Sequence, residues 1–112
     1  MIKTGRSIDQ PLTKIDDWFD LLTCSIVRQA VEDFRFYMRR LEEQTTVFKI
    51  LRYKAEIQAV LRFIDSQWYE DISPINRSVL KAQLRQEVME FIKKHKKHKG
   101  FYEREILHGL ER

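Results

Sequence analysis

The sequence predicts an all-α protein, and more specifically a three-helix bundle with a long first helix and a short C-terminal helix. No Gly or Pro occurs between Leu12 and Ser73, whereas strands and hairpins need turn residues far more often. Apolar residues also recur at spacings of three and four, which is the period of an amphipathic helix. At 112 residues the chain has the size of a single domain, 1–112, that can bury a core of its own.

The first helix is predicted to run from Thr13 to about Gln44, after an extended N-terminal lead over residues 1–11. Thr13 is a good N-cap residue and follows Pro11. At ~1.5 Å per residue this helix would be roughly 45 Å long. Its apolar arc covers about half of the circumference, so we expect it to pack against two other helices. The apolar positions are Ile15, Phe19, Leu22, Ile26, Ala30, Phe34, Met38 and Leu41, flanked by Trp18, Val27, Val31 and Tyr37.

The opposite side of this first helix is charged. Its basic residues alternate with acidic residues at pairing distances along the helix. Such a pattern predicts a solvated, salt-bridged face. The residues concerned are Arg28, Arg35 and Arg39, with Glu32, Glu42 and Glu43.

A second helix is predicted to follow Thr45 and Thr46 and to run to about Asp71. The two β-branched threonines weaken the continuity of the first helix, and either can cap the next one. The segment that follows again has one apolar face. Its residues are Ile50, Ile57, Val60, Leu61, Ile64 and Trp68, with Phe63 and Tyr69 beside them.

Two caps compete to begin the third helix: Ser73, followed by Pro74 at the first helical position, and Asn76. Gly100 is the expected C-cap of this helix. Residues 101–108 then predict a short terminal helix that folds back on the core. The apolar residues are Val79, Leu80, Leu84, Val88, Phe91 and Ile92 in the third helix, and Phe101, Ile106, Leu107 and Leu110 in the terminal segment.

The net charge of +4 lies entirely in the last third of the chain. Residues 1–80 contain 12 Lys and Arg against 12 Asp and Glu, whereas residues 81–112 contain 9 against 5. Within a seven-residue run, five lysines and two histidines occur with no acidic or apolar residue among them. Residues 93–112 are therefore expected to form a basic helix end, which has no apolar position to dock on the core, and the short terminal helix.

Three further basic residues precede this run at a spacing of four, with no acid between them, so the third helix is expected to present a basic track of about four turns. Positive charge is favourable at a helix C-terminus, and one interpretation is simply a solvated helix end. The other is an element that contacts phosphates or an acidic protein. The candidate partner- or phosphate-contacting residues are Arg77, Lys81, Arg85, Lys93, Lys94, Lys96, Lys97 and Lys99.

Other candidate chemistry is weaker. Asp16, Asp17 and Asp20 have the spacing with which two carboxylates share a diphosphate-bound Mg²⁺, but the chain is too short for that cavity, and the acids suit a helix N-terminus. The lysines around His95 and His98 oppose a cation there, so we expect solvated histidines, no metal and no cofactor. Cys24, the single cysteine, is expected to be a buried thiol. With no P-loop, dinucleotide or nucleophile-elbow motif, the sequence predicts no enzyme.

The composition also bears on location. No apolar stretch approaches the ~18–20 residues of a membrane span, and the first residues lack the apolar core of a signal peptide. One cysteine allows no internal disulfide. We therefore expect a soluble, cytoplasmic protein without a membrane partner.

Four segments of the sequence resemble a known group of proteins. These segments are residues 26–35, Glu56 and Ile57, residues 63–69 and residues 72–80. Over about residues 20–85 the chain resembles small uncharacterised proteins of phages and conjugative elements in Gram-positive bacteria. The matching positions are mostly of the core type, and the family supplies no catalytic residues. The resemblance implies a mobile-element setting, in which small proteins often bind a host machine to block or recruit it, anti-CRISPR and other anti-defence proteins among them.

The sequence supports three hypotheses about function, and we give the leading one first. The first is a non-enzymatic helical binding protein that engages or inhibits a host nucleic-acid-handling protein complex through the basic third helix. The second is an accessory factor that binds DNA or RNA directly, with steep salt dependence. The third is a self-associating bundle, in which a homodimer covers the wide apolar arc of the first helix.

Overall fold

The computed structural model describes residues 25–73 and 75–111, and these residues form helices and connecting turns without any strand. The all-α prediction is confirmed. Several predictions fall outside the described residues: the extended lead, the helix start at Thr13, the acidic group at Asp16, Asp17 and Asp20, and the buried thiol of Cys24.

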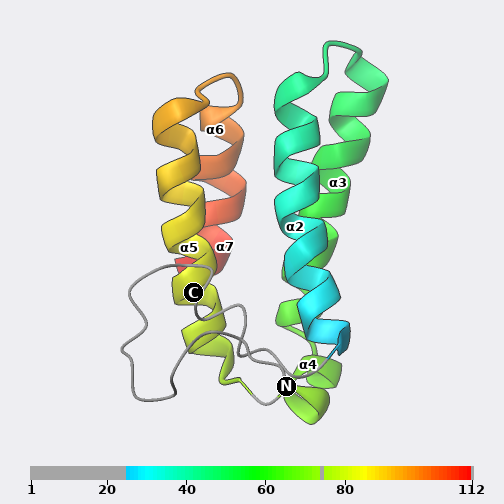
Figure 1. Ribbon diagram of the computed structural model, residues 1–112, viewed down its shortest axis with the longest axis vertical. Coiled ribbons are helices and arrows are strands. Elements are labelled where there is room, and N and C mark those ends of the chain that lie inside the picture. The colour runs from blue at the N-terminus through cyan, green and yellow to red at the C-terminus, as the bar shows by residue number, and fades with distance from the viewer. Residues whose placement is uncertain (1–24, 74, 112) are drawn as a thin grey trace, which may run out of the picture.

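Helices α2 (Ser25–Glu43) and α3 (Val47–Ile64) form an antiparallel hairpin (Figure 1). The three residues between them form a short loop after Glu43, close to the predicted break. The buried side chains of α2 recur at alternating steps of four and three, which places them in one seam against α3. This seam is rotated from the predicted one, so that Ile26 is 43% exposed although it was expected in the core. The seam residues are Val27, Val31, Phe34, Met38 and Leu41.

The second predicted helix is wrong in its length, because the chain breaks after Ile64 and a separate short helix, α4 (Gln67–Ile72), follows. The hydroxyl of Ser66 accepts a hydrogen bond from the Tyr69 N–H at 3.2 Å, which is an N-cap and begins α4. The break turns Tyr69 into the core, where its hydroxyl donates to the Ile75 carbonyl at 2.9 Å. Trp68, which was expected on the apolar face of the second helix, is left 54% exposed.

Helix α5 (Arg77–Lys94) begins after Asn76, whose side-chain oxygen accepts a hydrogen bond from the Ser78 N–H at 2.7 Å. Asn76 is therefore the N-cap, in preference to Ser73. Ser73 instead ends α4, and its hydroxyl accepts from the Ile75 N–H at 3.1 Å. Three short helices run on from one another after α5 and return antiparallel to it (Figure 1): α6 (Lys99–Phe101), the π-helix η1 (Tyr102–Ile106) and α7 (Leu107–Glu111).

Two predicted helix ends are wrong in this second hairpin: the third helix does not reach Gly100, and the terminal helix does not end at residue 108. Gly100 and Gly109 both lie inside the terminal helix. Gly100 is not the C-cap of the third helix. A Cβ atom there would lie 2.8 Å from a guanidinium nitrogen of Arg104, so the glycine lets this side chain lie against the backbone. At Gly109 a Cβ atom would meet Leu61 at 3.3 Å, which marks a close approach between the terminal helix and α3.

One apolar core lies between the two hairpins. Each of α2, α3 and α5 contributes a stripe to it, and the terminal helix closes it through residues spaced by four. The prediction missed Tyr102, which is fully buried. The core residues outside α2 are Ile57, Val60, Leu61, Ile64, Tyr69, Leu80, Leu84, Val88, Ile92, Phe101, Tyr102, Ile106 and Leu110.

A polar contact also joins the two hairpins across the edge of this core. The guanidinium of Arg35 in α2 donates two hydrogen bonds, each of 2.8 Å, to the two carboxylate oxygens of Glu87 in α5. This bidentate pair is mostly buried, with 20% and 11% of the two side chains exposed. The prediction of a solvated face is therefore wrong for Arg35, which lies at the junction between the hairpins.

The two buried tyrosines give a test of this packing. The Tyr102 hydroxyl is buried and accepts or donates no hydrogen bond among the described residues, whereas the Tyr69 hydroxyl bonds the Ile75 carbonyl. We expect Tyr69→Phe to lower the free energy of unfolding by about 1 kcal/mol, and Tyr102→Phe to lower it by less or to raise it. Urea unfolding of both variants measures the difference, and a larger loss in Tyr102→Phe would contradict this description of the core.

Candidate functional site

The lysine run lies at one end of the molecule, where the second hairpin turns. Helix α5 ends at Lys94, the His95 N–H donates to the Phe91 carbonyl at 2.9 Å, and α6 begins at Lys99. The prediction of a third helix that continues to Gly100 with a basic track of about four turns is therefore wrong. The physical reason is that Phe101 and Tyr102 are buried in the core, and their burial requires the chain to turn back after Lys94.

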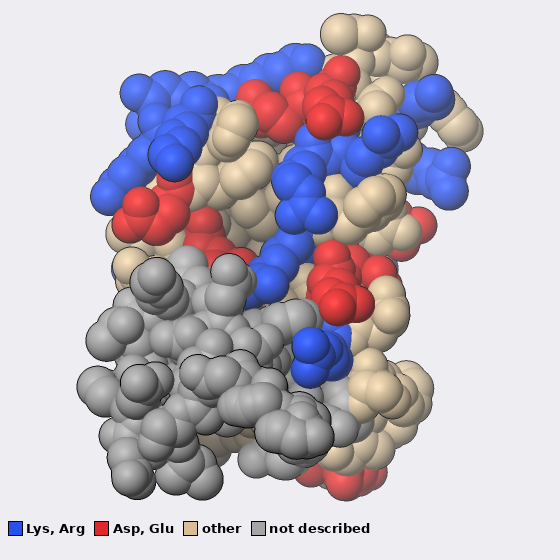
Figure 2. Space-filling model, in the orientation of Figure 1, with Lys and Arg blue, Asp and Glu red and all other residues tan. Residues whose placement is uncertain are grey.

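We call the five lysines of this turn the basic tip. All five are exposed, and Figure 2 shows Lys and Arg side chains gathered over this end of the molecule. Only two of them pair with acids among the described residues, at N–O distances of 3.6 and 3.9 Å on exposed side chains. Such pairs are weak in water. The basic tip consists of Lys93, Lys94, Lys96, Lys97 and Lys99.

One lysine of the basic tip also has an internal role. The Lys97 ammonium donates a hydrogen bond of 2.6 Å to the carbonyl of Gln44, immediately after the end of α2. The carbonyls at a helix C-terminus lack intrahelical partners and carry partial negative charge. Lys97 therefore ties the turn of the second hairpin to the loop of the first.

The two histidines of the run do not share a helix face. The His95 ring stacks on Phe91, with ring centroids 4.3 Å apart and planes at 28°. His98 lies in the turn, directly before α6, and is partly buried, so the expectation of two solvated histidines is wrong. The described residues contain no group of three or more His, Cys, Asp or Glu side chains arranged to hold a metal ion.

Beneath the basic tip, three polar atoms are buried without a hydrogen-bond partner among the described residues: Oε1 of Glu42, Nε2 of His98 and the hydroxyl of Tyr102. Burial lowers the pKa of His98, and the ammonium of Lys54 lowers it further, while Glu42 opposes the shift. Burial, together with the carboxylate of Glu42, raises the pKa of Tyr102. The basic tip thus rests on a partly buried, titratable cluster contributed by both hairpins.

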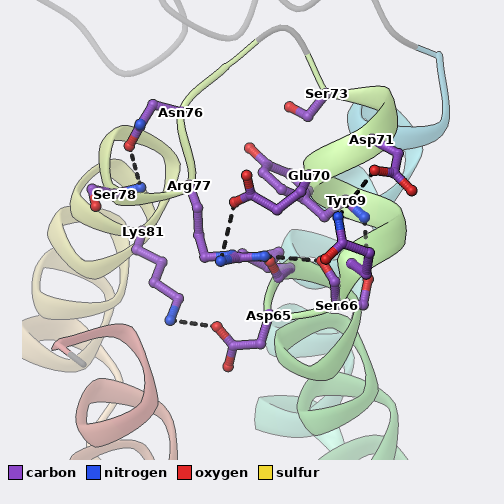
Figure 3. Close-up of polar contacts among 12 residues, drawn as sticks. Asp65, Ser66, Tyr69, Glu70, Asp71, Ser73, Asn76, Arg77, Ser78 and Lys81 are labelled. Atoms are coloured by element: carbon purple, nitrogen blue, oxygen red, sulfur yellow. Dashed lines mark hydrogen bonds and ion pairs between the residues drawn. The ribbon is translucent and has the colours of Figure 1, made fainter.

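Arg77 was predicted to contact a partner, but its guanidinium caps the C-terminal end of α3 (Figure 3). It donates to the carbonyls of Ile64 at 2.6 Å and Ser66 at 2.9 Å, and forms an ion pair with Glu70 at 3.0 Å. The bond to Ile64 satisfies a carbonyl that the end of α3 leaves open, and the Ser66 carbonyl also accepts from the Glu70 N–H at 3.5 Å. They also attach the start of α5 to the first hairpin.

Lys81 and Arg85 likewise have acidic partners from other parts of the chain. Lys81 is only 6% exposed and forms an ion pair with Asp65 at the end of α3 (Figure 3). Arg85 pairs with Glu111 at 3.1 Å on the exposed side of α5. The acids are distant in sequence, so the spacing of the basic residues contained no local signal that would have revealed them.

Of the eight predicted site residues, the structure therefore brings five together at the basic tip and uses the other three in contacts within the protein. Sequence reasoning missed Glu42 and Tyr102 as parts of this region, because nothing in their local sequence distinguishes them from neighbouring helical positions. No described helix combines the length and the apolar character needed to cross a membrane. No protein-family model, curated protein or solved structure matches the chain.

The capping role of Arg77 predicts a stability effect. Arg77→Met keeps the apolar stem but removes both hydrogen bonds to carbonyls, and we expect it to lower the free energy of unfolding by about 2 kcal/mol. The control is Arg62→Met, on an exposed residue of α3, for which we expect a change within about 0.5 kcal/mol. Equal effects in urea unfolding would contradict the capping role.

His98 predicts a pH dependence. The unfolded chain binds the proton at the ordinary histidine pKa of about 6.5, whereas the folded chain resists it until a lower pH, so acidification below about pH 6.5 favours unfolding. We expect His98→Asn to lose less thermal stability than the unsubstituted protein when the pH is lowered from about 7.5 to about 5. His108→Asn, at an exposed position, serves as the control, and an unchanged pH profile in His98→Asn would refute the assignment.

Proposed function

We propose that this chain is a non-enzymatic binding protein, built as a bundle of α2, α3 and α5 closed by the terminal helix, that engages a host protein complex handling nucleic acid. The basic tip is the observation that carries this proposal. The resemblance over about residues 20–85 supports a phage or mobile-element origin and an anti-defence role of the anti-CRISPR kind.

The basic tip suits contact with phosphates or carboxylates. Lys94 and Lys96 have no acidic partner among the described residues, and the acids that pair with Lys93 and Lys99 are exposed and weakly held. A polyanion can therefore replace those pairs at small cost. Each phosphate contacted releases counterions, which makes such binding strongly dependent on salt.

The aromatic residues beside the basic tip argue against base readout. Phe101 and Tyr102 follow the lysines directly, but both are buried in the core. The His95 ring is covered on one face by Phe91. Stacking platforms for unpaired bases are thus not offered there, and contacts to the nucleic-acid backbone or to an acidic protein surface are favoured.

Direct binding of DNA or RNA, without a host protein, is the second candidate. The same five lysines support it. It differs in one measurable respect: the purified chain would bind a nucleic acid by itself. A slope of about −3 to −4 in log affinity against log salt corresponds to roughly four phosphate contacts.

The test reverses three exposed lysines of the basic tip, Lys93→Glu, Lys94→Glu and Lys96→Glu, and leaves Lys97 in place because it bonds the Gln44 carbonyl. A control with the same change in net charge reverses three exposed basic residues of α2, α3 and α5, outside the basic tip. Tagged protein is used to isolate partners from host extract with and without nuclease, and binding of duplex and single-stranded DNA is followed by fluorescence anisotropy. The control substitutions are Arg40→Glu, Arg62→Glu and Arg85→Glu.

We expect the tip variant to lose a host protein that the control variant retains, with the far-UV helix signal unchanged in both. Retention of that protein after nuclease supports the first candidate. Retardation of DNA by the purified chain supports the second. If the tip variant behaves like the control in both assays, the basic tip has no binding role.

A further inference from the structure

Helix α3 has two apolar faces, only one of which lies in the core. The inner face contains Ile57 and Ile64, which are fully buried. On the outer side, near the start of the helix, Val47, Phe48 and Leu51 are 70%, 75% and 60% exposed. Large exposed apolar side chains that gather on one face commonly mark a contact surface.

The outer residues form a continuous stripe. Phe48, Leu51 and Ala55 follow one another at steps of three and four, so they lie on one side of the helix, and Ala55 is exposed as well. Leu51 and Ala55 also line a groove of about 280 Å³ between α3 and the terminal helix, with Phe101 on the other wall. We call Val47, Phe48, Leu51 and Ala55 the outer stripe.

Positive charge borders the outer stripe on both sides. Lys49 and Arg52 are exposed on α3 itself. Across the groove, the Lys54 ammonium lies 5.0 Å from the centre of the Phe101 ring, and Arg104 lines the far wall. The acidic residue that lines the groove, Glu105, accepts a hydrogen bond of 3.1 Å from Gln58, which lies farther along α3 than the outer stripe.

This charge decides between the possible occupants. In a symmetric dimer the same patch meets itself, so Lys49 and Arg52 of one copy would face basic residues of the other. Like charges that face each other across an interface oppose association. An apolar ridge with basic borders instead matches a helix whose apolar side is bordered by Asp and Glu.

We propose that the outer stripe is a docking site for an acidic amphipathic helix of a partner protein. Phe48 and Leu51 contact the apolar side of that helix, and Lys49, Arg52 and Arg104 contact its carboxylates. This site goes beyond the proposed function, because it uses residues outside the basic tip and recognises a helix in place of phosphates.

The test uses a synthetic peptide of about 20 residues, with leucines at helical spacing and glutamates on their flanks, and a counterpart with lysine in place of every glutamate. Fluorescence anisotropy measures the binding of each to the full chain. We expect the acidic peptide to bind at least about tenfold more tightly than the basic one. Leu51→Glu and Phe48→Ser should each weaken its binding by about tenfold, since both remove a central apolar contact.

Val79→Ser, at a 54% exposed position of α5, is the matched control and should leave binding unchanged. The tip variant with three Lys→Glu substitutions should also bind the acidic peptide, which separates this site from the proposed function. Equal binding of the two peptides, no binding of the acidic peptide, or unchanged binding in Leu51→Glu would each overturn the proposal. Two other results would also overturn it, if neither peptide binds. One is a dimer seen in sedimentation that Leu51→Glu abolishes, and the other is attachment to phosphatidylserine vesicles that Leu51→Glu abolishes.

Discussion

The C-terminal ends of the two helices in the first hairpin are both met by cations from the second hairpin. Arg77 donates to the Ile64 and Ser66 carbonyls after α3, and Lys97 donates to the Gln44 carbonyl after α2. The Ile64 and Gln44 carbonyls lie at the C-terminal ends of α3 and α2, where carbonyls lack intrahelical partners and form the negative ends of the helix dipoles. Because the donors belong to the other hairpin, the bonds that satisfy the helix ends also set how the two hairpins lie against each other.

The basic residues from the start of α5 onward thereby divide into two sets with different uses. Arg77 and Lys81 act inside the protein, where the end of α3 supplies carbonyls and the carboxylate of Asp65. The lysines of the basic tip remain mostly free for contacts outside it. A cation that is buried against fixed partners cannot also serve a ligand, so the distinction narrows the candidate binding surface from a track along α5 to one turn.

The basic tip and the outer stripe lie toward the same end of the molecule, where the loops of both hairpins meet (Figure 1). They differ in chemistry, since one is almost purely cationic and the other is an apolar ridge with cationic borders. Lys97 ties the turn that carries the basic tip to the loop that precedes α3. The two surfaces are therefore held in a fixed relation, which suits a protein that contacts a composite partner at one end.

Much of the fold was predictable from local patterns. The absence of Gly and Pro and the helical spacing of apolar residues identified α2, α3 and α5, and Asn76 was recognised as one of two caps because its side chain acts on the adjacent backbone. The break at Ser66, the return of the chain after Lys94 and the burial of Tyr102 were not predictable in this way, because they depend on packing between segments far apart in sequence.

The candidate site was likewise predictable only in part. Composition and spacing by themselves determined an all-α chain with its positive charge in the last third, since both follow from neighbouring residues. Only the tertiary structure decided which basic residues from α5 onward are bonded within the protein, because their acid and carbonyl partners, at Asp65, Ile64 and Gln44, come from the other hairpin.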